Sequence, residues 1–227
     1  MTLGCAAASQ AHAQSWFQFE AGVGALKYQD RGDGVWYQQG APSWSESLSA
    51  PVLTAGFTGP IIARSNWGID WHVDYVYMGT ARSNCECTPV DANYNQQTHQ
   101  MRTPLVVSVP NSDFIGSGHL NGIALALEPY YVYRGIRLGV SAGLFPNIPT
   151  WHETVIGWSA ASGMQPRNIS VSSGHYVSLG QVVGASVGHG NLSLSLQHYF
   201  LPMKKADYPP IWSGATVLML KYKANVF

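Results

Sequence analysis

The sequence predicts an all-β protein: a closed, antiparallel, up-and-down transmembrane β-barrel of about eight strands. Apolar residues alternate with polar or small ones along several segments, and no long segment shows the 3.6-residue period of an amphipathic helix. Charged residues make up only 11% of the chain, well below the roughly 25% usual for soluble domains. Because no run of about 18 apolar residues could form a spanning helix, the low charge favours a barrel whose wall faces lipid.

The opening residues predict export. Ala11-His12-Ala13 fits the small-x-small pattern that precedes a signal cleavage site. Residues 1–13 are therefore expected to be a signal segment, and residues 14–227 an outer-membrane barrel with long extracellular loops. No Lys or Arg precedes the short apolar stretch, which agrees with a start that lies inside a longer precursor.

The first strand is expected at residues 16–28, and the clearest one at residues 67–78. In the second of these, large apolar or aromatic side chains alternate with small ones and with Asp70, His72 and Asp74. Trp and Tyr near both ends are typical of the aromatic girdles of membrane barrels. Alternation alone also fits a soluble sandwich, in which the apolar face would be the core.

The remaining strands follow the same two-residue period. They are expected at residues 52–58, 120–128, 136–144, 176–187, 192–200 and 216–227.

The links between strands differ in length in a way that predicts orientation. Short links fall at residues 59–66, 131–135 and 188–191, and long polar ones at 29–47, 79–117, 146–173 and 202–214. Outer-membrane barrels have short periplasmic turns and long extracellular loops. The link from Gly79 to Ser117 is polar and aromatic, so it is the expected contact for an extracellular partner. A hydrophilic cap over the barrel mouth is the alternative.

The end of the chain, ATVLMLKYKANVF, is an alternating segment with a terminal aromatic residue. It resembles the C-terminal signal of bacterial outer-membrane proteins that the barrel-assembly machinery reads. Residues 14–227 resemble, at the level of pattern, the small eight-stranded barrels of the OmpA transmembrane-domain type. This resemblance implies the bacterial outer membrane as location, and outer-membrane lipid and lipopolysaccharide as partners. Phe227 departs from the family pattern because it shares parity with Lys221 and Lys223, which a β-bulge would repair.

Strand parity places a set of ionisable residues on the face opposite the apolar one. They are Glu20, Asp70, His72, Asp74, Glu128, Arg137, Lys221 and Lys223. An eight-stranded barrel is just wide enough inside for side chains to fill it, and buried charges need partners. We therefore expect an interior polar network that forms a paired plug, rather than an open channel or an ion pathway.

His198 is the candidate catalytic residue, although an interfacial polar side chain is the simpler interpretation. It falls on the lipid-facing parity of residues 192–200, in a segment that resembles the lipid A deacylase barrels. In those barrels the Ser nucleophile follows the His two positions on, whereas position 200 here is Phe. Residues 186–190 resemble a glycine turn of lipid A palmitoyltransferase barrels. A pair of His72 with Asp70 or Asp74 is a further catalytic alternative, with structural ion pairing more common.

No metal or cofactor is expected. The His residues lack a second donor at metal-ligand spacing, and Cys85-x-Cys87 has no second cysteine pair. The two cysteines could instead form a local disulfide in an oxidising compartment.

Together these features predict a small outer-membrane surface barrel, structural or interaction-mediating, without catalysis. One alternative is a lipid A-modifying outer-membrane enzyme of the deacylase or palmitoyltransferase kind. Another is a soluble calyx that binds a small apolar ligand. Lys+Arg and Asp+Glu number 12 each, so the chain lacks the basic field that nucleic acid requires.

Overall fold

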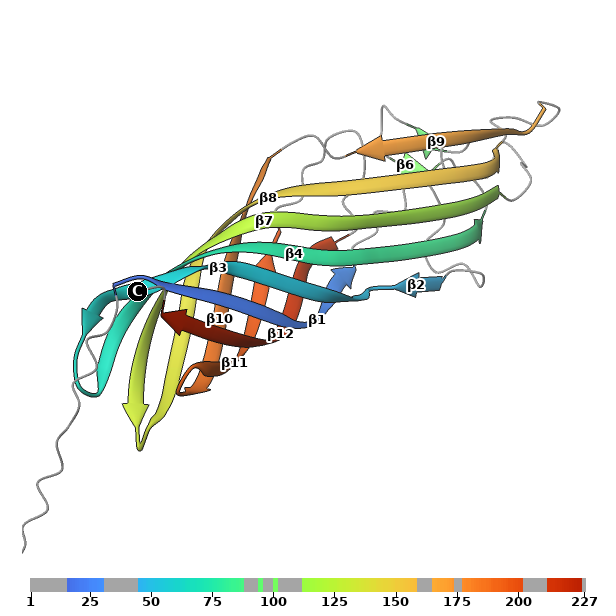
Figure 1. Ribbon diagram of the computed structural model, residues 1–227. Helices are drawn as coiled ribbons and strands as arrows, with labels where there is room; N and C mark the ends of the chain where they lie inside the picture. The colour runs from blue at the N-terminus through green and yellow to red at the C-terminus, as the bar shows by residue number, and fades with distance from the viewer. Residues whose placement is uncertain are drawn as a thin grey trace, which may run out of the picture.

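A computed structural model describes residues 16–30, 45–87, 94–95, 100–101, 112–158, 165–173, 177–201 and 212–225 (Figure 1). The expected signal segment, the side chains of Cys85 and Cys87, and the terminal Phe227 lie outside the described residues. Within the described ranges, no helix is both long and apolar enough to cross a bilayer.

The main architecture is a closed ring of antiparallel strands in which neighbours along the chain are neighbours in space. The ring contains β1 (Gln18–Asp30), β3 (Ser49–Ala63), β4 (Trp67–Cys87), β7 (Ser112–Tyr133), β8 (Ile136–Trp158), β10 (Ser178–His189), β11 (Leu192–Phe200) and β12 (Trp212–Asn225). Pairing of β12 with β1 closes it, with Gln18 opposite Asn225. The predicted up-and-down barrel is confirmed. Four short strands stand outside the ring: β2 (Ser45–Ser47), β5 (Tyr94–Asn95), β6 (Gln100–Met101) and β9 (Arg167–Ser173).

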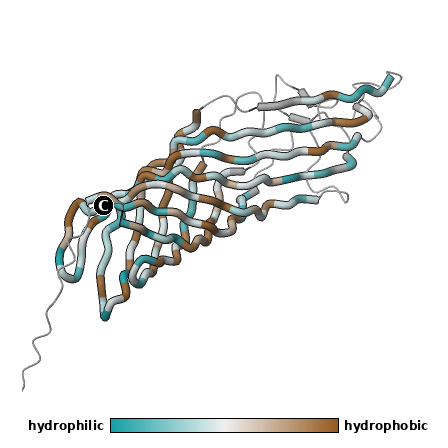
Figure 2. Tube along the Cα trace, viewed as in Figure 1, coloured by the Kyte–Doolittle hydropathy of each residue, from teal (hydrophilic) through white to brown (hydrophobic). Residues whose placement is uncertain are grey.

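The outer wall of the ring is apolar. On β4, the outward-facing Trp67 and Tyr75 are 48% and 51% exposed, whereas the inward-facing Asp70 and Asp74 are each 3% exposed. Figure 2 shows hydrophobic and hydrophilic residues alternating along the barrel strands. A water-soluble protein rarely exposes a continuous apolar surface of this kind, so the soluble calyx expectation does not fit this wall.

The interior of the ring has two layers. Near the ends of the strands that meet the long links, apolar and aromatic side chains pack together. Among them, Tyr28, Met78, Leu120, Phe145 and Tyr199 are each at most 1% exposed. Near the short turns, the interior is lined instead by ionisable residues. The described apolar side chains thus pack together across the lumen at this level.

Three ring strands continue far beyond the others. β4, β7 and β8 contain 21, 22 and 23 residues, about twice the 9–11 residues that a spanning strand needs. β2 pairs with the end of β4, and β9 pairs with the end of β8. We call this projecting part, made of β2, residues 80–87, 112–121 and 149–158, and β9, the extramembrane sheet (Figure 1).

The extramembrane sheet corrects the predicted long loops. Residues 79–87 and 112–117 are strand rather than loop, and so are 146–158 and 167–173. The links 29–47 and 202–214 are also shortened, by β2 and by the start of β12. The sequence conceals these strands because both faces are mixed in polarity. Glu153 lies beside Trp151 on the inner face, and Ile156 lies beside Thr154 on the outer face.

The opposite end of the barrel carries tight turns. Arg134 and Gly135 connect β7 to β8 with φ angles of 51° and 80°, as in the primed hairpin turns that match strand twist. The predicted link 59–66 is shorter than expected, because β3 continues through Gly59 and Pro60 to Ala63 with a register shift at Pro60. Short turns here, and long links at the other end, indicate that this end faces the periplasm.

Candidate functional site

The ionisable residues predicted for the interior lie together in the half of the lumen nearer the short turns. β1 supplies Glu20, β4 supplies Asp70, His72 and Asp74, β7 supplies Glu128, β8 supplies Arg137, and β12 supplies Lys221 and Lys223. The two-residue period of the strands points all of these side chains inward. Glu20 is fully buried, and Lys221 is 6% exposed.

Arg137 joins two carboxylates from different strands. Its Nη1 lies 2.8 Å from Oδ2 of Asp70, and its Nη2 lies 2.7 Å from Oε1 of Glu128. The guanidinium also stacks over the ring of Tyr130, with 3.6 Å between its central carbon and the ring centroid. Lys223 approaches the same Asp70 oxygen at 3.7 Å. This half of the network links β4, β7, β8 and β12 across the lumen.

Lys221 joins the two remaining carboxylates, those of Glu20 and Asp74, in the same way. Its Nζ donates a hydrogen bond to Oδ2 of Asp74 at 2.6 Å and lies 3.6 Å from Oε1 of Glu20. Register explains how these acids meet. Gly56 of β3 stands between Glu20 and Asp74, and a Cβ at that glycine would lie 2.5 Å from Oδ1 of Asp74. The absence of a side chain on β3 therefore lets β1 and β4 interact directly.

His72 pairs across the lumen rather than along its own strand. Its Nδ1 forms a 2.6 Å hydrogen bond with Oε1 of Glu20, and its Nε2 lies 3.8 Å from Oε2 of Glu128. His72 thus forms its hydrogen bond with Glu20, not with Asp70 or Asp74, the partners named in the catalytic alternative. Residues two apart on a strand share a face, but their side chains lie parallel, whereas a long side chain from another strand reaches the imidazole end-on.

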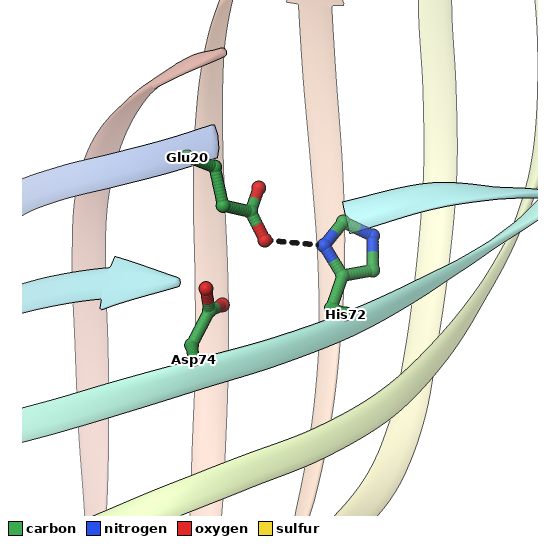
Figure 3. Close-up of side chains that lie close together, drawn as sticks. All are labelled: Glu20, His72 and Asp74. Atoms are coloured by element: carbon green, nitrogen blue, oxygen red, sulfur yellow. Dashed lines mark hydrogen bonds and ion pairs between the residues drawn. The ribbon is translucent and has the colours of Figure 1, made fainter. Parts of the chain in front are cut away.

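Glu20, His72 and Asp74 form the one group of metal-ligand type among the described residues (Figure 3). One ligand atom from each lies within 4.8 Å of the others. However, the ammonium of Lys221 already contacts both carboxylates. The chain thus supplies its own cation, and the arrangement fits an ion-pair cluster better than a metal centre.

A cavity of about 170 Å³ adjoins this cluster and extends to the β10–β11 turn. Oε2 of Glu20 and Oδ1 of Asp74 are buried without a hydrogen-bond partner from the protein. A polar cavity of this size can hold water that satisfies such atoms. The interior site is therefore suited to holding the strands together.

His198 lies on the outer wall, half-buried, as its parity predicts. Its Nδ1 is 2.9 Å from the hydroxyl oxygen of Thr216 on β12, and its ring meets Phe200 edge-on at 4.6 Å. The hydroxyl that position 200 lacks is therefore present on a neighbouring strand. Among the described residues, those that line the surrounding groove include no carboxylate that could orient the imidazole as in a hydrolase triad.

The upper edge of the apolar belt is sharp. The outward-facing residues change from apolar to polar between Tyr77 and Thr80 on β4, between Ile123 and Asn121 on β7, and between Ile148 and Thr150 on β8. Register places these changes side by side, since Tyr77 faces Asn121 and Asn121 faces Ile148. Such a boundary is expected where hydrocarbon gives way to lipid headgroups.

Above this boundary, the outer face of the extramembrane sheet is mainly polar, with Ile115 and Ile156 also exposed on it. A groove of about 640 Å³ runs over β2, β4 and β7, with outward-facing Ser47, Arg82, Asn84 and Ser117 in its lining. His152 on β8 lies 3.4 Å from the hydroxyl of Ser170 on β9. The sequence pattern predicts loops in this region, and only the weak alternation of residues 151–156 indicates a strand there.

No family model matches this chain, and no curated protein matches it. Comparison with solved structures returns small bacterial outer-membrane barrels. Ail, the attachment invasion locus protein of Yersinia pestis, solved in complex with sucrose octasulfate, has 13% identity and a TM-score of 0.36, over 91% of this chain and 98% of Ail. Neisserial surface protein A has 14% identity and a TM-score of 0.38, over 92% and 97%.

The backbone structure of Ail in a phospholipid nanodisc has 11% identity and a TM-score of 0.30, over 91% of this chain and 98% of Ail. The ring of strands and the apolar belt decide the architecture of the present chain. It is a small outer-membrane-type β-barrel.

Proposed function

We propose that this chain is a bacterial outer-membrane surface protein that acts by contact, through its extramembrane sheet, and not by catalysis. One observation carries the proposal: β4, β7 and β8 continue as paired strands well above the edge of the apolar belt. A barrel that served only as a membrane plug would not need this length.

The extramembrane sheet has the properties of a contact surface. Its strands are hydrogen-bonded to a rigid barrel, so a partner would meet a preorganised face at little entropic cost. The outer face offers hydroxyl, amide and guanidinium groups around the groove beside Ser117 and Arg82. These groups suit a polar partner, such as a carbohydrate or a hydrophilic protein surface.

The location is tested by labelling intact cells with a membrane-impermeant maleimide. With Cys85→Ser and Cys87→Ser as background, Ser117→Cys places a thiol on the extramembrane sheet, and Ser65→Cys places one in a short turn. We expect labelling at position 117 in intact cells, and at both positions after the outer membrane is permeabilised. Labelling of intact cells at position 65 but not at position 117 would show that the barrel has the opposite orientation, and would contradict the proposal.

The contact is tested with the full chain in nanodiscs on arrays of immobilised glycans and extracellular-matrix proteins. Ser117→Arg projects a long charged side chain into the groove, and Ser65→Arg makes the same change at the short-turn end. We expect the wild-type signal to fall about tenfold in Ser117→Arg, equivalent to about 1.4 kcal/mol, and to persist in Ser65→Arg. Equal binding by both variants would show that the sheet is not the contact surface.

Absence of catalysis is tested separately by mass spectrometry of lipid A from cells that express the chain. We expect the acyl pattern to match that of cells without it. A lost or added acyl chain that depends on His198 would instead establish lipid A modification.

A further inference from the structure

A row of polar side chains crosses the outer wall on four adjacent strands. His198 on β11 is paired with Thr216 on β12, Thr216 with Lys27 on β1, and Lys27 with Ser49 on β3. All four face outward. The next outward residues toward the periplasm are apolar: Leu196, Leu218, Ala25 and Pro51. The row therefore lies at the upper edge of the apolar belt, at the depth of lipid headgroups.

A groove of about 700 Å³ includes this row and the apolar residues below it. Ala25 on β1 is paired with Leu218 on β12, and Ser49 lies on the next strand, β3; the small side chains of Ala25 and Ser49 leave a hollow in the wall beside the larger Leu218. The upper part of the groove is thus polar and its lower part apolar, as one continuous surface.

Charge distinguishes this part of the wall from the rest. Below the extramembrane sheet, the described residues of the ring strands that face outward include a single basic residue of the Lys or Arg type, which is Lys27. No carboxylate among the described residues forms an ion pair with it. His198 uses Nδ1 for Thr216, so its Nε2 is available to a further partner.

We propose that this groove binds a phosphate-bearing lipid of the outer leaflet. The ammonium of Lys27, with Nε2 of His198 and the hydroxyl of Ser49, would contact the phosphate oxygens by charge-assisted hydrogen bonds. The apolar residues below the row would contact the acyl chains. The inference rests on the proposed function, because acyl chains reach this wall only when the barrel lies in a membrane.

The test uses the full chain, purified and delipidated in a zwitterionic detergent, with lipid binding measured by native mass spectrometry. The probes are diphosphoryl lipid A, the same lipid without its phosphates, and inorganic phosphate. We expect the wild type to bind the phosphorylated lipid about tenfold more tightly than the dephosphorylated one. Lys27→Gln should abolish this preference, Lys27→Arg should retain it, and Arg64→Gln, which removes a cation from the turn between β3 and β4, should leave it unchanged.

Folding of each variant is checked by heat-modifiable migration in gels. If Lys27→Gln fails this check, Ser49→Glu replaces it, because a carboxylate in the same row should repel the phosphate and remove the preference. Equal binding of the two lipids by the wild type, or a preference that survives both variants, would overturn the inference. If inorganic phosphate binds as tightly as the phosphorylated lipid, the groove recognises phosphate alone, and the proposal that a lipid occupies it is overturned. A wild type that is soluble without detergent would instead defeat the proposed function itself.

Discussion

Lys221 is the residue on which the interior depends most, because two buried carboxylates on two other strands share its ammonium. Arg137 has the equivalent position for Asp70 and Glu128. Removal of either cation would leave buried negative charge without compensation, which costs far more than the ion pair itself contributes. Individual side chains therefore control the stability of the whole ring.

We expect Lys221→Met to lower the free energy of unfolding by about 3–5 kcal/mol, because Glu20 and Asp74 then lose their cation. Denaturant unfolding in detergent, followed by Trp fluorescence, measures the change. Adding Asp74→Asn to Lys221→Met should recover part of the loss, since one buried charge is removed. Lys27→Met, on the outer wall, should change stability by no more than about 0.5 kcal/mol. An equally small effect of Lys221→Met would contradict the described pairing.

At this scale, strand parity in the sequence predicts which side chains enter the lumen, because the period of a strand is fixed. It does not predict their partners. The pairing of His72 with Glu20 crosses β3, and the approach of Asp74 to Glu20 passes over the glycine at position 56. Likewise, the hydroxyl beside His198 comes from Thr216, a residue 18 positions away. Such contacts follow from register, which local pattern does not give.

At the scale of elements, the strands divide into a short set that ends near the membrane surface and a long set that continues beyond it. The sequence locates all of the ring strands, because their membrane parts alternate clearly between apolar and polar residues. It misses the extensions of β4, β7 and β8, whose two faces both carry mixed residues once lipid no longer selects for an apolar side.

Hydrogen exchange tests the extensions directly. Backbone amides of residues 82–84, 114–117 and 152–154 are expected to exchange slowly, because they belong to paired strands rather than loops. Mass spectrometry of peptides from the full chain in detergent measures the rates, with the turn residues 65 and 66 as a fast-exchanging reference. If these amides exchange as fast as those of the turn, the segments are loops, and the extramembrane sheet is contradicted.

The β7–β8 turn provides a second test at this scale. Arg134 has a φ of 51°, a left-handed conformation that Asn adopts more readily than Arg. Arg134→Asn, which creates the preferred Asn-Gly turn, should raise the free energy of unfolding by a few tenths to about 1 kcal/mol. Arg134→Val, with a β-branched side chain, should lower it. The opposite order in denaturant unfolding would contradict the turn geometry.

At the scale of the whole molecule, three zones follow one another along the barrel axis. Ion pairs occupy the periplasmic half of the lumen, packed apolar side chains fill the other half, and the extramembrane sheet projects beyond. A lumen filled in this way holds the shape of the barrel but offers no path for ions.

The filled lumen predicts that the wild type gives no steady single-channel current in planar bilayers. Phe145→Ala combined with Tyr199→Ala, which removes two rings in edge-to-face contact from the apolar layer, is expected to permit intermittent current. Steady conductance by the wild type would show that the apolar layer does not seal the lumen.

The most direct measurement of the central claim is which residues contact lipid. With the three native cysteines replaced, nitroxide labels at Ile69, Val140 and Leu194 report on the outer wall, and labels at Ala124, Ser141 and Ser195 on the lumen. In vesicles, electron paramagnetic resonance should show high accessibility to oxygen and low accessibility to a water-soluble nickel chelate at the first three sites alone. The reverse result, with the first three sites shielded from lipid, would contradict a barrel whose apolar side faces the membrane.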